Sequence, residues 1–226
     1  MLRRLFRAPL LTLGLALAAL DAPPAHAETV TADATLPSGL AVRPNSVGAF
    51  RRIEVTIENT SNASHVVKFD YGTFFDAADE SYQDLAVVFQ QDVSVAAGSQ
   101  ATVTVLTTCM AAEKGVTSSG YNAWQVKRDR ELGDLLRFYE ASRPMIETIT
   151  GPQYHDTQEE RHNFLQMLVW AYYGDDPGHV TDFATRYIFN GDGAAASRFV
   201  NTLWPLANAV LSAYKSGAVR SFILGR

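Results

Sequence analysis

The sequence predicts an α+β protein, in which an immunoglobulin-like antiparallel β-sandwich is followed by a helical segment. Residues 28–108 are rich in Thr and Val, and their apolar and polar side chains alternate as in half-buried strands. From Lys127 onward the apolar residues recur instead at helical spacing. Strands first and helices second is an order expected of an α+β protein.

The first 27 residues resemble a cleaved signal peptide. A start that carries three arginines precedes an apolar stretch at 10–20, and Ala25-His26-Ala27 has the small residues that signal peptidase accepts. The apolar stretch is too short to span a bilayer comfortably. We therefore expect cleavage after Ala27 and an extracytoplasmic mature protein that is periplasmic, secreted or surface-associated.

The sandwich is expected at 28–110, where short strands are separated by turn residues. Residues 53–58 alternate strictly, with an apolar side chain at every odd position. Further short extended runs follow at intervals typical of two-sheet immunoglobulin-like domains. Residues 111–126 are then expected to form a linker loop, and 127–226 a helical segment that packs on the sandwich.

The helical segment shows clear start and stop signals. Thr157 and Glu160 form a capping box, in which the Thr hydroxyl accepts the backbone N–H of the Glu and the Glu side chain reaches back. Proline and glycine residues limit the helices. The predicted helices are one that begins near 127 and is limited by Pro144, one from Thr157 to Tyr173, one at 181–189, and one from 194 that ends at Gly217.

Charge and composition exclude several classes of function. The chain has 226 residues and a net charge of −5, and removal of residues 1–27 leaves 16 basic and 23 acidic residues, a net charge of −7. A mildly acidic surface with scattered basic residues disfavours nucleic acid and anionic lipid as partners. The sequence has no P-loop, dinucleotide fingerprint or G-x-S-x-G motif, so we expect no cofactor. After cleavage we also expect no integral membrane segment.

One thiol and one amide are unusual in their surroundings. Cys109 closes the last predicted strand and is the single cysteine, so it cannot form an internal disulfide. Gln166 is the one amide among the ten residues at 164–173, which are otherwise apolar or aromatic, so we expect it to be buried with hydrogen-bond partners. Three roles remain open for Cys109: a small buried apolar residue, a nucleophile, or a sulfur protected by a covalent bond. Gln166 either ties its helix to a backbone segment of the sandwich or takes part in chemistry.

Two short motifs resemble those of bacterial thioester-domain surface adhesins. Residues 165–170 follow the pattern apolar, Gln, two variable residues, apolar, Trp, and Cys109-Met110 lies upstream at the end of an extended segment. In that family a Cys thiol and a Gln side chain condense, with loss of ammonia, into an internal thioester. The resemblance implies that Cys109 is the sulfur donor and Gln166 the acyl donor. It also implies covalent capture of an amine on a target, which we expect to be a protein or a surface glycan.

An enzyme that uses Cys109 as a nucleophile is the main alternative. Such a site needs an imidazole within hydrogen-bond reach of the thiol, oriented by a third group. His162 lies one helical turn from Gln166 on the same stripe, and we therefore name Cys109, Gln166 and His162 as the candidate catalytic residues. The other histidines that could serve are His65, His155 and His179.

A metal site is not expected. Glu159 and His162 are three residues apart on a helix, a spacing that can share a metal ion. However, no HExxH motif occurs, and acidic residues in a first helical turn are ordinary partners of the helix dipole. The sequence therefore favours an exported binding or adhesion protein without turnover. The alternatives are a secreted cysteine-dependent hydrolase and a structural periplasmic domain.

Overall fold

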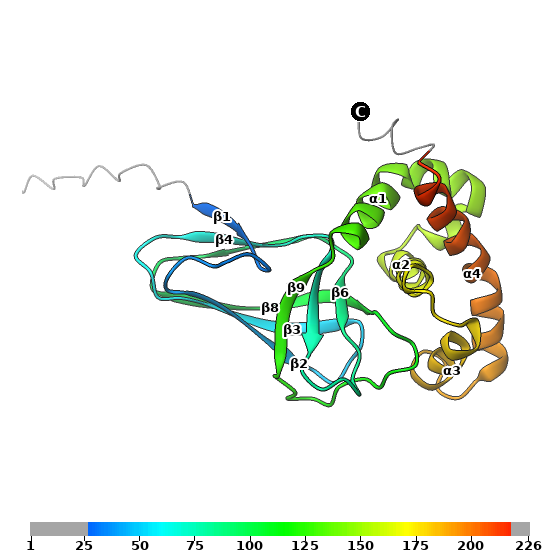
Figure 1. Cartoon of the computed structure of the whole chain (residues 1–226), viewed down its shortest axis with the longest axis horizontal. Coiled ribbons are helices and arrows are strands. Elements are labelled where there is room, and N and C mark those ends of the chain that lie inside the picture. Colours follow the sequence, from blue (N-terminus) through cyan, green and yellow to red (C-terminus); the bar gives the residue numbers. More distant parts are fainter. Residues whose placement is uncertain (1–26, 218–226) are drawn as a thin grey trace, which may run out of the picture.

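The computed structural model describes residues 27–217, and over this range the protein is α+β, as predicted. Strands occupy one half of the molecule and helices the other (Figure 1). The predicted signal peptide at 1–27 lies outside the described residues except for Ala27, and so do residues 218–226.

The larger of the two sheets has six strands, all paired in antiparallel fashion. It curves until it is nearly barrel-shaped (Figure 1). The alternation predicted at 53–58 is confirmed, because Ile53, Val55 and Ile57 are all fully buried. In sheet order the strands are β2 (Leu40–Ser46), β3 (Arg52–Asn59), β8 (Ser99–Cys109), β6 (Leu85–Val87), β5 (Thr73–Ala77) and β9 (Trp124–Arg128).

The smaller sheet consists of β1 (Glu28–Thr31), β4 (His65–Phe69) and β7 (Gln91–Val95). Its β1–β4 pair is parallel, unlike the fully antiparallel sheets expected from the sequence. Strand β7 contacts β3 and β8 of the larger sheet, and the core extends between the sheets.

The strand region continues beyond the boundaries expected from the sequence. Strand β9 covers the end of the expected 111–126 linker, and Lys127 and Arg128 belong to it rather than to the helical segment. The strand forms because Trp124 turns into the core while its neighbours alternate outward, and because it pairs with β5. Its two cations face opposite sides: Lys127 is exposed and pairs with Asp76, whereas Arg128 is half-buried and pairs with Asp33 and Asp70.

Helix α2 is the central element of the helical half (Figure 1). It contacts β8 on one side and α4 on another, and most of its residues from His162 to Ala171 are buried. The predicted capping box is present, with Thr157 as the N-cap and Glu160 as its reciprocal partner. The helices are α1 (Arg130–Thr150), α2 (Gln158–Tyr173), α3 (Pro177–Tyr187) and α4 (Gly193–Lys215), with a short 3₁₀ helix, η1 (Pro152–Tyr154), after α1.

The expectation that Pro144 limits the first helix is wrong. Helix α1 begins at Arg130, where the Asp129 side chain accepts the backbone N–H of Leu132, and it continues through Pro144 to Thr150. A proline in a helix removes one backbone donor and crowds the preceding turn. Here the residues beyond it still bury apolar surface, since Ile146 belongs to the core, and this packing offsets the local cost.

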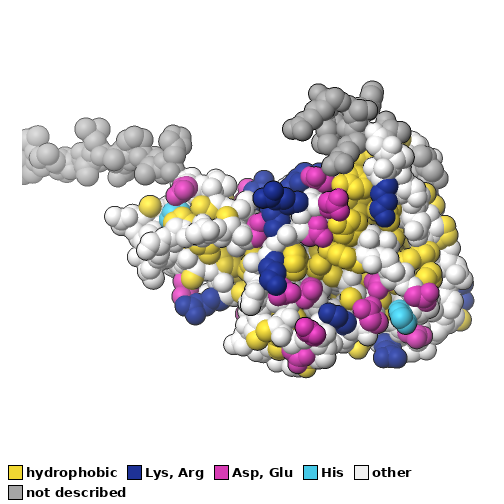
Figure 2. All heavy atoms as spheres, in the orientation of Figure 1, with side chains coloured by type: hydrophobic (Ala, Val, Ile, Leu, Met, Phe, Trp, Pro, Cys, Tyr) yellow, Lys and Arg dark blue, Asp and Glu magenta, His cyan; other side chains and the backbone are white. Residues whose placement is uncertain are grey.

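The surface is mixed in charge. Figure 2 shows Lys and Arg side chains next to Asp and Glu side chains over the region where strands and helices meet, with hydrophobic side chains between them. Among the helices at 27–217, none combines the length and the apolar character needed to cross a membrane.

The first turn of α1 lies very close to the turn at Tyr71–Gly72, and Gly133 permits this approach. A Cβ atom on Gly133 would lie 2.7 Å from the carbonyl oxygen of Tyr71. Gly133→Ala should therefore lower the free energy of unfolding by about 2 kcal/mol, although alanine is normally the better helix former by about 1 kcal/mol. Urea denaturation measures the difference.

Gly115→Ala is the matched control for this prediction. A Cβ atom there would meet its nearest neighbour, the Ser81 carbonyl oxygen, at 3.6 Å, which is an ordinary contact. We expect its stability to stay within about 0.5 kcal/mol of the wild type. A Gly133→Ala protein as stable as this control would show that α1 does not need the close approach.

Candidate functional site

The site forms where β8 continues past the end of β3. The paired register of these strands ends at Arg52 and Leu106, and one further bond joins the Thr107 N–H to the Arg51 carbonyl oxygen at 2.9 Å. Beyond that point no strand among the described residues pairs with this edge of β8. Because the backbone groups there are buried, they need other hydrogen-bond partners.

Helix α2 supplies these partners through two side chains. His162 Nε2 lies 2.6 Å from the carbonyl oxygen of Thr107. The Gln166 amide Nε2 donates to the carbonyl oxygen of Cys109 at 2.8 Å, and its Oε1 accepts the Cys109 N–H at 3.1 Å. His162 and Gln166 are four residues apart, which is a rise of about 6 Å along a helix. Thr107 and Cys109 are two residues apart, which is about 6.8 Å along a strand, so the two spacings match. The side chains of α2 thus take the place of a missing strand.

The Cys109 thiol lies in the interior next to this junction. Cys109 and Gln166 both have 0 % exposure, as the sequence predicted for the amide. The sulfur makes a long contact of 4.0 Å with the Phe50 carbonyl oxygen. Burial raises the pKa of the thiol well above its ordinary value, and the nearby Arg51 guanidinium offsets only part of this shift. Cys109 is therefore a neutral thiol at physiological pH.

The segment 48–51 covers the sulfur. The Phe50 ring packs edge-on against Phe183 of α3, with centroids 5.2 Å apart, and Phe183 packs in turn against Trp170 of α2 at 5.3 Å. Arg51 donates to the Asn163 side-chain oxygen on α2 at 2.5 Å. The segment is thus held to both α2 and α3, next to the buried thiol.

His162 is neutral and its tautomer is fixed. A carbonyl oxygen can only accept, so Nε2 carries the proton that is donated to Thr107, and Nδ1 keeps the lone pair. Burial, and secondly the charge of Arg51, lower the pKa of His162 to about 4. The ring also packs edge-on against Phe89 at 5.7 Å. An unprotonated acceptor nitrogen is therefore present one helical turn from Gln166.

An open pocket adjoins these residues between the large sheet and α2, and we call it the sheet–helix pocket. Its volume is about 400 Å³. It is bordered by Phe50 and Arg51 of the covering segment and by the His162 imidazole that bonds β8, whereas Cys109 and Gln166 do not line it. Its lining residues are Ala49, Phe50, Arg51, Arg52, Leu106, Gln158, Glu159 and His162.

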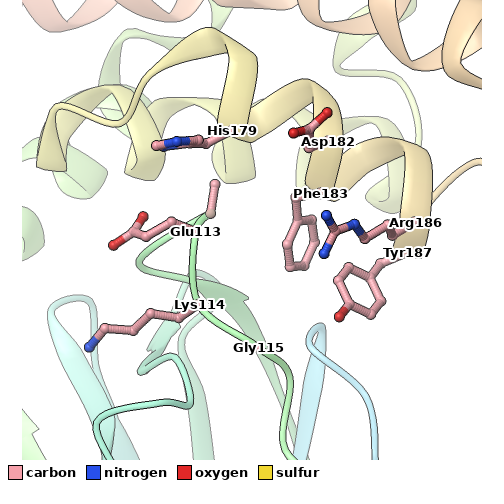
Figure 3. Close-up of a pocket in the computed structure, with 9 residues that line it drawn as sticks. Glu113, Lys114, Gly115, His179, Asp182, Phe183, Arg186 and Tyr187 are labelled. Atoms are coloured by element: carbon pink, nitrogen blue, oxygen red, sulfur yellow. The ribbon is translucent and has the colours of Figure 1, made fainter.

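A second pocket of about 220 Å³ lies between α3 and the loop after β8. Figure 3 shows His179, Asp182 and Arg186 on α3 and Glu113 on the facing loop. Next to it, Asp175 has its pKa raised to about 7, first by burial and then by its hydrogen bond with Glu113, while the Ala112 N–H opposes the shift. The lining mixes both charges, and His179, Asp182 and Glu113 are exposed.

The structure brings together the three residues that the sequence named. Cys109, Gln166 and His162 meet at the same stretch of β8, whereas His155 bonds the Tyr139 hydroxyl at 2.8 Å and His65 lies near Ser61. Within residues 27–217 no group of three or more His, Cys, Asp or Glu side chains is arranged to hold a metal ion.

Sequence reasoning missed the residues that cover the thiol. Arg51 had been counted among scattered surface cations, and Phe50 had not been singled out. Neither lies in a motif, and they reach Cys109 only because β3 starts where β8 leaves it. A contact of this kind depends on strand register, which leaves no local signal in the sequence.

Comparisons with known proteins give no further assignment. No family model, no curated protein and no solved structure matches this chain. The chemistry of the site must therefore be inferred from its own residues.

The pairing between Gln166 and the Cys109 backbone can be tested by substitution. Gln166→Leu keeps a similar volume but leaves one buried N–H and one buried carbonyl without partners. We expect the free energy of unfolding to fall by about 2–5 kcal/mol in urea denaturation. Gln158→Leu, at an exposed position of the same helix, should change it by less than about 0.5 kcal/mol. Equal effects of the two changes would contradict this role of Gln166.

The neutral state of His162 should make stability depend on pH. Its pKa is lowered from 6.5 to about 4 on folding, so protonation favours the unfolded chain. The stability conferred by neutral His162 is complete above pH 6.5 and is lost as the pH falls toward 4. Between pH 7 and pH 5 the wild type should lose about 2 kcal/mol more than His162→Gln, which can still donate to Thr107. Parallel stability curves for the two proteins would refute this prediction.

Proposed function

We propose that the protein is an exported binding protein that attaches to its target covalently, through an internal thioester between Cys109 and Gln166, without turnover. One observation carries this proposal. Both polar atoms of the fully buried Gln166 amide are hydrogen-bonded to the backbone of Cys109, whose own side chain is also fully buried. The single cysteine of the chain and the one amide of the apolar stretch of α2 are thus joined residue to residue.

The proposed bond forms by condensation. The Cys109 sulfur attacks the side-chain carbonyl carbon of Gln166, the C–N bond breaks, and ammonia leaves with the thiol proton. The product is a C–S bond with no change of oxidation state. Both side chains have 0 % exposure, and this burial slows hydrolysis of the thioester by water.

The motif around Gln166 supports this chemistry. The pattern apolar, Gln, two variable residues, apolar, Trp resembles that of bacterial thioester-domain adhesins, and here both Gln166 and Trp170 are fully buried on the same stripe of α2. A thioester also accounts for a lone sulfur in an exported protein, because a bonded sulfur is not oxidised as a free thiolate would be.

The architecture supports a binding role. Two packed sheets next to a helical layer are compatible with an immunoglobulin-like sandwich, a scaffold often used for recognition at surfaces. With the signal-like leader at 1–27, this suggests an extracytoplasmic module whose target is a protein or a surface glycan. The absence of turnover follows from the chemistry, since each molecule would react once and stay attached.

A cysteine-dependent hydrolase is less well supported by the same residues. Nucleophilic catalysis needs a thiolate that substrate can reach. Cys109 has 0 % exposure and a raised pKa, and the Nε2 of His162 is already bonded to the Thr107 carbonyl. A purely structural domain would keep the Gln166 hydrogen bonds but form no bond to sulfur.

Intact mass spectrometry of the mature wild-type protein tests the thioester. We expect a mass lower than that of the sequence by one molecule of ammonia. After treatment with hydroxylamine we expect the mass of this thioester form plus one hydroxylamine, because a hydroxamate on residue 166 replaces the C–S bond and frees the thiol. Cys109→Ala should show neither the deficit nor the adduct. A wild type at its full sequence mass, with a thiol that labels once unfolded, would overturn the proposal and leave the pair as a structural junction.

A further inference from the structure

We infer that the sheet–helix pocket receives the target as a primary amine accompanied by a carboxylate, as on a lysine beside an acidic residue. This inference rests on the proposed thioester and specifies which amines reach it. The carboxylate would be bound by Arg51 and Arg52, and the amine would pass along α2 to the carbonyl carbon of Gln166.

The pocket is locally positive in a chain whose net charge is −5. Arg51 and Arg52 both line it, against the single carboxylate of Glu159, while His162 is neutral. Among residues 27–217 neither arginine forms an ion pair with an acidic side chain. Two unpaired guanidinium groups at the mouth of a concave site attract a carboxylate, to which guanidinium binds in bidentate fashion.

Arg51 has an unused donor. Its Nη2 bonds Asn163, but its Nε is buried and has no hydrogen-bond partner among the described residues. A buried donor without an acceptor is uncommon in folded proteins and calls for an explanation. A bound carboxylate or carbonyl oxygen would satisfy it.

One face of α2 carries a row of residues from the pocket to the buried amide. Glu159, His162 and Gln166 are spaced i, i+3 and i+7, so they lie along one stripe of the helix. Glu159 is exposed at the pocket, His162 is almost buried, and Gln166 is fully buried. An arriving ammonium group would first meet the Glu159 carboxylate, then the unprotonated Nδ1 of His162, and last the acyl carbon of Gln166.

The reaction balances without an added oxidant or reductant. The ammonium group loses one proton to His162 Nδ1, and the resulting amine attacks the thioester carbonyl carbon. The C–S bond breaks, and the sulfur leaves as a thiolate near Arg51, whose positive charge favours that form. The second amine proton passes to the sulfur, His162 releases its proton to water, and an amide joins the target to Gln166.

The test compares two probes of equal chain length. One is 6-aminohexanoate, which carries an amine and a carboxylate, and the other is cadaverine, which carries two amines. Intact mass measured over time gives the rate at which each adds to the wild-type protein, with Cys109→Ala as the unreactive reference. We expect 6-aminohexanoate to react about three- to tenfold faster, the range typical of one or two partly exposed ion pairs.

Arg52→Gln should remove most of this preference, because it removes one of the two guanidinium groups that would bind the carboxylate. Arg52 is exposed, so we expect the fold to stay unchanged. Arg43→Gln is the matched control, since Arg43 is an exposed residue of β2 that pairs with Glu58 outside the pocket. If the ammonia deficit is found and both probes add at equal rates, or if Arg52→Gln keeps the preference, this inference is wrong and the thioester stands. If the deficit itself is missing, the proposed function fails first.

Discussion

The helical half of the molecule depends on one constraint, which is that β8 is longer than its neighbour β3. Past Leu106 the backbone of β8 is still buried, and polar groups without partners there would cost about 1–3 kcal/mol each. Side chains of α2 satisfy them, with His162 at Thr107 and Gln166 at Cys109. These bonds fix the height and rotation of α2, and since α4 packs on α2 and α3 on α4, they fix the helical layer as a whole.

Elements with a strong local signal could be predicted from the sequence. The capping box at Thr157 gave the start of α2, and the alternation at 53–58 gave β3 and its buried face. Elements that form through pairing with distant segments could not be predicted in this way. Strand β9 exists because it adds to β5, and β1 runs parallel to β4, which depends on how distant segments meet. Packing likewise carried α1 through Pro144, where local propensity alone predicts a stop.

The candidate site shows the same division. Gln166 was recognisable because a single amide in an apolar stretch must find partners, and Cys109 because it ends a strand on its buried face. The bonds of Gln166 to the backbone of Cys109 are the structural role that the sequence left open beside the chemical one, and their geometric cause is the match between helical and strand repeats. Phe50 and Arg51 belong to the site through their position before β3, and no pattern in the sequence marks them.

The order of the bonds between α2 and β8 has a mechanical consequence. His162 precedes Gln166 just as Thr107 precedes Cys109, so helix and strand run in the same sense where they join. A tensile force along β8 would therefore load these bonds together, in shear, rather than peel them apart one after another. The junction that holds the two halves is thus also arranged to resist pulling.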